Sequence, residues 1–290
     1  MIRAPEAACL GRFSYGGSGK EQEGMFIYRV MHEGSARWAM QREDGDALEL
    51  LAQRSFEDLV EGYATGLEGI EELGTVEDAV LLAPSVPTKI LCIGLNYRHH
   101  AEEMNKEVPD EPLMFMKPVS ALLGPDRAVE LPPQSALVHH EGELAMVVGK
   151  RAKNVTEEDF FDVIFGYACA NDVTARDIQR REGKYTRGKG FDTFCPFGPR
   201  LRPARELEIE REVVTCRVNG EVRQTSGVDD LIFKLPQVVK FISEVMTLMP
   251  GDIILTGTPS GVGELLDGDE VEVEVTGVGV LSHTVSGVLK

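Results

Sequence analysis

The hydrophobic positions along the chain fall into short runs that are typical of strands. Near the N-terminus apolar and polar residues alternate, and glycine-containing turns separate three predicted strands at 26–31, 36–40 and 47–51. The Pro-Ser-Val-Pro segment at 84–87 then predicts a stiff linker. We therefore expect a loosely ordered extension over residues 1–24, a small β-rich N-terminal module over 25–84, and a larger domain over 85–290.

Beyond the linker the pattern again favours strands. Continuous apolar runs are typical of buried strands, and they lie at 90–93, 113–118, 141–149, 163–170 and 253–256. Asn219-Gly220 separates two further runs and predicts a type I′ hairpin of strands 213–218 and 221–225. Apolar residues at helical spacing predict one amphipathic helix over 236–246, and residues 269–288 predict two more strands.

Composition narrows the class of protein. The 290 residues include 48 acidic and 30 basic side chains, which gives a formal net charge of −18. This balance argues against a nucleic-acid or anionic-membrane partner, because either would need a basic face. No apolar run approaches the roughly 18 residues of a membrane span, and the N-terminus lacks a signal-peptide apolar core. Five widely spaced cysteines form no CxxC motif, so we expect reduced thiols in a soluble, cytoplasmic protein.

Two glutamates and an aspartate are the candidate metal ligands. Glu141 and Glu143 lie two apart on a predicted strand, so they project from one face about 7 Å apart. Asp172 ends the next apolar run and can bring a third carboxylate to the same place. Three carboxylates without a thiol suit Mg²⁺ or Mn²⁺ better than zinc. The alternative for the glutamate pair is the solvated face of an edge strand, which that pattern alone favours.

A histidine and a glutamate form the candidate acid–base pair. On a short helical turn after the strand at 90–93, His100 and Glu103 are i,i+3 neighbours. A carboxylate beside an imidazole orients the ring and raises its basicity, as a general base for water requires. The alternative is an ordinary surface helix, since segment 98–111 is charged throughout.

Several polar residues close to these motifs are candidate ligands for a substrate. Arg176 and Gln179 share one helix face near the carboxylates, where Arg176 either neutralises them or clamps a substrate carboxylate. Lys189 lies between two glycines and can stabilise an oxyanion. Lys117 ends a strand, and a structural role there is as well supported as a substrate role. Thr258, in a glycine-rich loop, offers backbone and hydroxyl groups to an anion.

The start of the helix that carries Arg176 has a local signature of its own. Thr174 and Asp177 have the spacing of a capping box, directly after Asp172. We therefore assign Asp177 to capping this helix and not to binding a metal.

These motifs resemble the fumarylacetoacetate hydrolase family, and the resemblance covers roughly residues 85–290. Each motif alone is moderately specific, but five in the family's order make a strong assignment. The resembling segments are Ile93-Gly94-Leu95-Asn96-Tyr97 with His100, Glu141-Gly142-Glu143-Leu144, Gly166-Tyr167 followed by Asn171 to Gln179, Gly188-Lys189-Gly190-Phe191-Asp192, and Gly251-Asp252 followed by Thr256-Gly257-Thr258-Pro259.

The resemblance implies an α+β fold, namely a β-rich mixed-sheet roll with helices packed outside, and a homodimer. Carried onto this sequence, the family's site consists of the metal ligands Glu141, Glu143 and Asp172, the water-activating pair His100 and Glu103, Lys189 at the substrate oxygens, and the substrate contacts Arg176, Gln179 and Thr258. The chain departs from the family around His99 and His140. On a strand His139 would share the face of the glutamates, so a histidine-containing ligand set stays open beside Asp172.

The chemistry expected of such a site starts from a 2-oxo acid that chelates Mg²⁺ or Mn²⁺, which stabilises its enolate. Attack of water on a C4 carbonyl would cleave an acylpyruvate, a 2,4-dioxo acid, to pyruvate and an acid, and this hydrolysis is the leading hypothesis. The alternative is an isomerase or decarboxylase of 2-oxo dicarboxylates from aromatic catabolism, such as 2-hydroxyhepta-2,4-diene-1,7-dioate isomerase or an oxaloacetate decarboxylase. A hypothesis of another class is a non-catalytic protein that binds a metal and an anion.

Overall fold

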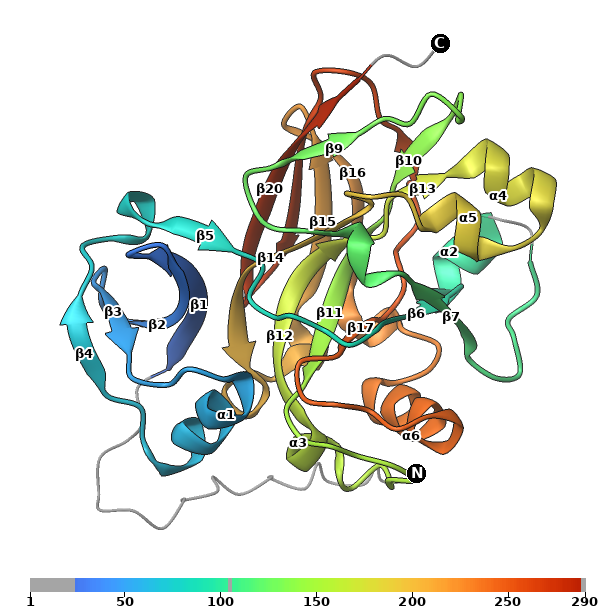
Figure 1. Cartoon of the computed structure of the whole chain (residues 1–290). Coiled ribbons are helices and arrows are strands. Elements are labelled where there is room, and N and C mark those ends of the chain that lie inside the picture. Colours follow the sequence, from blue (N-terminus) through green and yellow to red (C-terminus); the bar gives the residue numbers. More distant parts are fainter. Residues whose placement is uncertain (1–23, 104–105, 288–290) are drawn as a thin grey trace, which may run out of the picture.

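The computed structural model describes residues 24–103 and 106–287, and strands dominate its α+β architecture (Figure 1). The strands are β1 (Met25–His32), β2 (Ser35–Arg42), β3 (Leu48–Leu51), β4 (Gly69–Glu72), β5 (Val80–Leu82), β6 (Ile90–Gly94), β7 (Leu113–Lys117), β8 (Leu122–Leu123), β9 (Ala128–Glu130), β10 (Val138–His140), β11 (Gly142–Val148), β12 (Ile164–Asn171), β13 (Thr174–Ala175), β14 (Cys195–Pro203), β15 (Val213–Val218), β16 (Glu221–Gly227), β17 (Ile253–Leu255), β18 (Gly263–Glu264), β19 (Glu270–Val275) and β20 (Gly279–Ser286). The α-helices are α1 (Phe56–Thr65), α2 (Arg98–Glu103), α3 (Phe160–Val163), α4 (Arg176–Glu182), α5 (Tyr185–Lys189) and α6 (Leu235–Val245). The expected extension over 1–24 lies outside the described residues, apart from Gly24.

One mixed sheet of twelve strands runs through both parts of the chain. Its order is β4-β3-β2-β1-β14-β12-β11-β17-β6-β7, with β5 paired to β1 and β8 to β14. The N-terminal strands, on the left in Figure 1, join the remainder where Ile27 of β1 pairs with Leu201 of β14. The expected N-terminal module therefore continues the large sheet, and the boundary between residues 84 and 85 stays a prediction.

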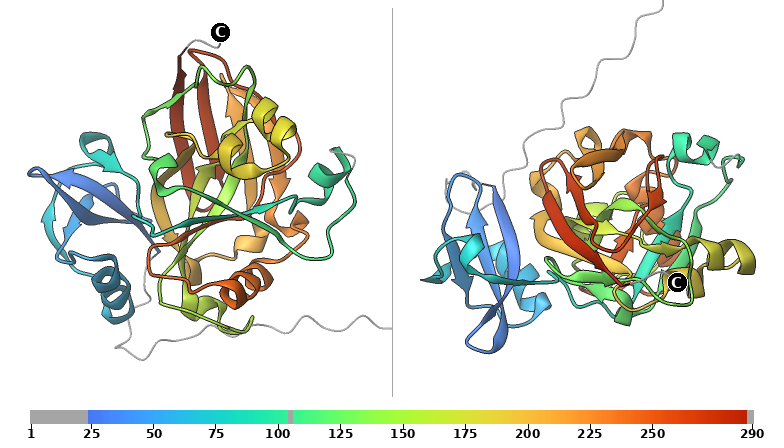
Figure 2. Two further views of the ribbon diagram at one scale, coloured as in Figure 1. Left: turned by 45° about the vertical axis from the view of Figure 1, so that its right-hand side comes forward. Right: turned by 90° about the horizontal axis from the view of Figure 1, so that it is seen from above.

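A second sheet packs over the centre of the first, and a hydrophobic core lies between them (Figure 2). This sheet has the order β16-β15-β19-β20-β9. Leu144 and Met146 of β11 pack in the hydrophobic core that contains Cys216 of β15. Ala145 and Val147 point the other way and pack in a separate core. Strand β11 is thus buried on both faces, which explains its continuous apolar run.

The residue between the two glutamates must be small because the second sheet lies close to the backbone there. A Cβ atom on Gly142 would lie 2.8 Å from Cβ of Cys216 and 3.4 Å from Cγ1 of Val273. The first distance is shorter than side chains tolerate, so one of the sheets would have to shift. Glycine at this position therefore lets β15 pack directly against the strand that carries the candidate ligands.

Most of the predicted elements are present at the expected places. The strand predicted at 141–149 is β11, the strand at 163–170 is β12, and the helix at 236–246 is α6. Asn219 and Gly220 have φ angles of 54° and 77°, as a type I′ turn requires, and join β15 to β16. The fold class is the predicted β-rich, mixed-sheet α+β architecture.

One local prediction is wrong. The N-cap position of α4 is Ala175, and no side chain caps the helix. The Asp177 carboxylate instead accepts hydrogen bonds from the Ser135 hydroxyl at 2.6 Å and the Ala136 N–H at 3.1 Å. The Thr174 hydroxyl donates to the carbonyl of Asp172. Both side chains have the spacing of a capping box, but they form hydrogen bonds with other groups instead.

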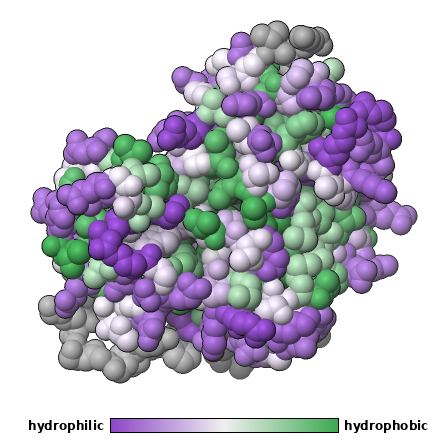
Figure 3. Space-filling view, in the orientation of Figure 1, coloured by the Kyte–Doolittle hydropathy of each residue, from purple (hydrophilic) through white to green (hydrophobic). Residues whose placement is uncertain are grey.

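In the view of Figure 3, hydrophobic surface residues lie mainly toward the centre of the molecule, and hydrophilic residues lie mainly along its rim. Across the described ranges, every helix is too short or too polar to cross a bilayer.

Candidate metal centre and active site

The residues proposed from the sequence converge on one pocket of about 310 Å³. Eight of the nine candidate site residues line it, and they come from five separate segments: His100, Glu141, Glu143, Asp172, Arg176, Gln179, Lys189 and Thr258. The ninth, Glu103, contacts His100. Far-separated motifs thus meet because β6, β11, β12 and β17 are neighbours in one sheet. The antiparallel strand β11 begins at the end of the sheet where the other three strands finish.

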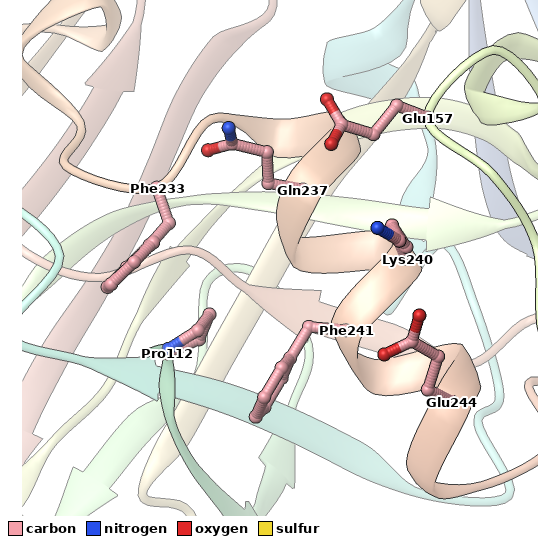
Figure 4. Close-up of a pocket in the computed structure, with 7 residues that line it drawn as sticks. All are labelled: Pro112, Glu157, Phe233, Gln237, Lys240, Phe241 and Glu244. Atoms are coloured by element: carbon pink, nitrogen blue, oxygen red, sulfur yellow. The ribbon is translucent and has the colours of Figure 1, made fainter. Parts of the chain in front are cut away.

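A second, smaller pocket of about 170 Å³ lies over α6 (Figure 4). Two phenylalanine rings and a proline form its apolar part, and charged side chains of α6 form its rim. It contains no histidine or cysteine and none of the candidate residues. The candidate site residues therefore gather in the larger pocket.

Three buried carboxylates form the centre of the larger pocket. Oxygen atoms of Glu141, Glu143 and Asp172 all lie within 4.8 Å of one another. Glu141 precedes β11, Glu143 lies on it, and Asp172 follows the adjacent strand β12. Each of the three is at most 6 % exposed. The prediction that the three carboxylates meet is confirmed, and the edge-strand alternative is wrong because β11 lies between β12 and β17.

Lys189, Lys117 and Arg176 compensate part of this negative charge. The Lys189 ammonium lies 2.8 Å from Glu141 and 2.5 Å from Asp172. Arg176 pairs with the other oxygen of Glu141. Burial opposes ionisation of Glu141, but the charges of Lys189 and Arg176 outweigh it and hold the pKa of this carboxyl well below its usual range.

Glu143 has a different environment, although it is only two residues away. Among the described residues its carboxylate has no lysine or arginine partner and accepts the backbone N–H of Gly257 at 2.8 Å. Burial, together with the charges of Asp172 and Glu141, raises the pKa of Glu143 well above its usual range. A divalent cation bound to the three carboxylates would remove this repulsion. The oxygen-only donor set and its charge therefore fit Mg²⁺ or Mn²⁺.

Among the described residues, no histidine joins the group of three carboxylates. His139 lies on β10, in the separate three-stranded sheet β13-β10-β18, opposite Thr174 and Glu264. Within the described ranges, the group of potential ligands at the site contains carboxylates alone. Burial and the nearby Arg176 lower the pKa of His139 to about 4.

The acid–base pair has the predicted contact. Nδ1 of His100 lies 3.1 Å from the Glu103 carboxylate, and His100 is 6 % exposed. Since a carboxylate accepts, Nδ1 carries the proton and Nε2 of the neutral ring keeps its lone pair. The same carboxylate accepts the N–H of Gly261 at 3.1 Å, which fixes it against the loop after β17. The pair can therefore take up and return a proton in the pocket.

Arg176, Gln179 and Thr258 are in place, and a side-chain polar atom of each already has a protein partner. Arg176 donates to Oε1 of Gln179 at 2.6 Å in addition to its ion pair with Glu141. The Thr258 hydroxyl donates to the carbonyl of Gly142 at 2.9 Å and accepts from the Gln224 amide at 2.7 Å. Of the two roles considered for Arg176, the structure shows neutralisation of a carboxylate.

Three further buried side chains support the ligands, and of these the sequence singled out only Lys117, whose role it left open. Lys117 donates to Asp172 at 2.6 Å, Asn171 accepts the N–H of Glu141 at 2.8 Å, and Gln224 accepts the N–H of Gly142 at 2.9 Å. Lys117 ended a predicted buried strand, and Asn171 is adjacent to Asp172, so both had a weak local signal. Gln224 had none, because the hairpin pattern only places it on a strand.

Comparisons with known proteins identify the family of this chain. Residues 89–286 match the model of the fumarylacetoacetate (FAA) hydrolase C-terminal family. The chain is 42% identical over 214 residues to the mitochondrial oxaloacetate tautomerase Fahd2a of Rattus norvegicus, covering 70% of this chain and 68% of that protein.

Two solved structures are similar in fold and sequence. A 5-carboxymethyl-2-hydroxymuconate delta-isomerase from Mycobacterium smegmatis has a TM-score of 0.79 and 37% identity, covering 91% of this chain and 100% of that one. A fumarylpyruvate hydrolase from Pseudomonas aeruginosa, in complex with Mn²⁺ and pyruvate, has a TM-score of 0.65 and 33% identity, covering 72% and 91%. With the family match over most of its length, the chain belongs to the fumarylacetoacetate hydrolase family, whose members include isomerases, hydrolases and a tautomerase.

Proposed function

We propose that this protein is a Mg²⁺- or Mn²⁺-dependent enzyme that converts 2-oxo dicarboxylates of the oxaloacetate type between their enol and keto forms. The observation that carries this proposal is the position of His100, paired with Glu103, in the same pocket as the three carboxylates. A bound Mg²⁺ or Mn²⁺ would act as a Lewis acid on the carboxylate and 2-oxo oxygens of the substrate and stabilise its enolate charge.

The residues of the chain supply the proton transfer. Nε2 of His100 takes the proton that leaves the substrate and returns it at the other position, so that an enol O–H is exchanged for a C3–H bond. Glu103 holds the ring in the required tautomer and stabilises the imidazolium that forms. Lys189 and Arg176 hold the Glu141 carboxylate and supply positive charge next to the substrate oxygens.

The charge of the pocket supports a substrate with a second carboxylate. Apart from the three clustered carboxylates and the Tyr185 phenol, the titratable residues that line the pocket are basic: His100, Lys106, Arg176, Arg180 and Lys189. This is notable in a chain with a net charge of −18. A basic rim favours an anionic distal group over the neutral acyl group of a simple acylpyruvate. The activity named for the rat relative, oxaloacetate tautomerase, agrees with this preference.

Hydrolysis of a C–C bond in an acylpyruvate-type 2,4-dioxo acid is the second candidate function. It is favoured by the same His100–Glu103 pair, which is able to activate water as well as to move a proton. The fumarylpyruvate hydrolase neighbour, solved with Mn²⁺ and pyruvate, also supports it. Decarboxylation of oxaloacetate would use the same pocket and differ only in the bond that breaks.

One experiment separates these reactions. Purified protein is mixed with oxaloacetate or with acetylpyruvate, with and without Mn²⁺, while enol absorbance and products are followed. Metal-dependent loss of the oxaloacetate enol without pyruvate or CO₂ supports tautomerisation, whereas pyruvate with CO₂ indicates decarboxylation. Pyruvate and acetate from acetylpyruvate indicate hydrolysis. Bound Mn²⁺ without acceleration of any of these reactions would contradict the proposal.

We propose in addition that the protein acts in the cytoplasm as a homodimer, without nucleic acid or membrane partners. These assignments come from the charge balance and from the family resemblance. Size-exclusion chromatography coupled to light scattering would test the dimer directly.

A further inference from the structure

Gly142, between the two glutamate ligands, is held on both sides by buried side chains. Its N–H donates to Oε1 of Gln224 at 2.9 Å, and its carbonyl accepts the Thr258 hydroxyl at 2.9 Å. Gln224 belongs to β16 of the second sheet and Thr258 to the loop after β17. They are 1 % and 4 % exposed. The backbone that carries the ligands is thus tied to two other elements at this one residue.

Every hydrogen-bonding atom of the Gln224 amide is used. Oε1 also lies 3.0 Å from Nδ1 of His140, while Nε2 donates to the Thr258 hydroxyl at 2.7 Å and to the Pro259 carbonyl at 2.8 Å. The orientation of the amide is unambiguous, because a backbone N–H requires an acceptor and a backbone carbonyl requires a donor. A flipped amide would lose both of these bonds.

The orientation of Gln224 fixes that of Thr258. Because Nε2 of Gln224 donates to the Thr258 oxygen, the hydroxyl hydrogen is free to bond the carbonyl of Gly142. That hydrogen is therefore unavailable to an anionic ligand. The backbone N–H of Thr258, in contrast, has no acceptor among the described residues, and Thr258 lines the pocket. The N–H is the donor that this residue can offer to a ligand.

We propose that Gln224 is a positioning residue that fixes the Glu141-Gly142-Glu143 backbone and orients the Thr258 hydroxyl, so that Thr258 meets a ligand through its backbone N–H. This inference rests on the proposed metal site. Residues behind metal ligands set ligand geometry, and their loss typically weakens metal affinity about 10–100-fold. The second sheet, which carries Gln224, thus contributes to the geometry of the proposed metal site in addition to covering the hydrophobic core.

The test measures Mn²⁺ affinity of the full chain by calorimetric titration, independently of turnover. Gln224→Met keeps the length of the side chain and removes all four hydrogen bonds, and we expect it to weaken Mn²⁺ binding by roughly 10-fold or more. Gln134→Met makes the same chemical change at an exposed position in the turn before β10 and serves as the matched control. Circular dichroism and thermal melting check that both variants are folded.

Thr258 variants keep the test decisive if Gln224→Met does not fold. Thr258→Val removes the hydroxyl and should weaken Mn²⁺ binding, whereas Thr258→Ser keeps it and should restore the affinity. In protein saturated with Mn²⁺, oxalate, used as a 2-oxo acid analogue, should bind Thr258→Val within about twofold of the wild type, because the N–H remains. If the hydroxyl contacted the ligand directly, oxalate affinity would fall and Mn²⁺ affinity would not.

Gln224 and Thr258 should also act as one unit. The Gln224→Met, Thr258→Val double variant should lose clearly less Mn²⁺ affinity than the product of the two single losses. The inference would be overturned if the loss of Mn²⁺ affinity in the double variant equalled the product of the two single losses. It would also be overturned if folded Gln224→Met bound Mn²⁺ as tightly as the wild type. Failure of the wild-type chain to bind Mn²⁺ would instead overturn the proposed function, so the two failures are distinguishable.

Discussion

The ammonium group of Lys117 lies 2.6 Å from a carboxylate oxygen of Asp172 in the protein interior. The two residues come from β7 and from the end of β12, and each is 1 % exposed. Lys117 also donates to the carbonyl of Val173 at 3.1 Å. Asp172 therefore has a fixed orientation toward the other two carboxylates before any cation binds.

Replacing Lys117 by methionine should destabilise the metal-free protein and make it more dependent on the metal. Removing one partner of a buried ion pair costs about 3–5 kcal/mol when the other charge is left uncompensated. Asp172 would keep its contact with Lys189, so we expect a loss below that range. Bound Mn²⁺ supplies positive charge at Asp172, so it should raise the melting temperature of Lys117→Met more than that of the wild type.

The matched control is Lys89→Met. Lys89 pairs with the buried Asp252, which is not one of the clustered carboxylates. This variant should also melt earlier, but Mn²⁺ should not restore its stability preferentially. Equal Mn²⁺-induced shifts in the Lys117 variant and the wild type would contradict a role of Lys117 at the metal site.

His100→Asn should lower kcat on oxaloacetate by roughly 10²–10⁴-fold, the usual contribution of a general acid–base group, while Mn²⁺ affinity stays near that of the wild type. Stopped-flow recording of enol absorbance and a Mn²⁺ titration measure the two quantities. The neighbouring His99→Asn is the control, because His99 is exposed and pairs with Asp230 outside the pocket. Similar kcat values for both variants would show that His100 does not transfer the proton.

Arg180→Gln should raise KM for oxaloacetate by roughly 2–10-fold without changing kcat, as expected of an exposed charge worth about 1 kcal/mol. The effect should be smaller for acetylpyruvate, whose distal group is neutral, and should diminish at high salt. Arg181→Gln is the control, because Arg181 is exposed next to it but does not line the pocket. Equal changes for both substrates would argue against a second carboxylate as the specificity determinant.

Below neutral pH the buried His283 should destabilise the protein. Burial lowers the pKa of His283 to about 4, whereas an unfolded histidine titrates near 6.5. As the pH falls below about 6.5, only the unfolded state gains this proton, so stability decreases until about pH 4, by about 3 kcal/mol in total.

The variant His283→Gln tests this dependence, because an amide oxygen can still accept the hydrogen bond from Asn171 that Nε2 of His283 accepts at 2.9 Å. Urea unfolding at pH 7 and pH 5 gives the two free energies of unfolding. The decrease between them should be smaller for the variant than for the wild type. An equal decrease in both proteins would mean that His283 does not titrate as a buried neutral group.

Local patterns predicted most of the secondary structure near the site. The run around β11 is apolar throughout because both of its faces are buried, and the Asn219-Gly220 pair has the positive φ angles that its turn requires. The order of the family motifs identified all three carboxylates that the structure brings within 4.8 Å. Such signals can be recognised in the sequence because they depend on residues close to one another in the chain.

Contacts between distant segments could not be predicted from such local patterns. Thr174 and Asp177 have the spacing of a capping box, yet both side chains bond to groups outside it. The sequence by itself predicted which segments form buried strands, which carboxylates form the candidate metal site, and to which family the chain belongs. Only the tertiary structure decided that Lys117 holds Asp172 and that Gln224, 82 positions from Gly142, holds the backbone between the glutamates. The reason is physical: a buried polar group must find a partner, and which one it finds depends on how the two sheets pack.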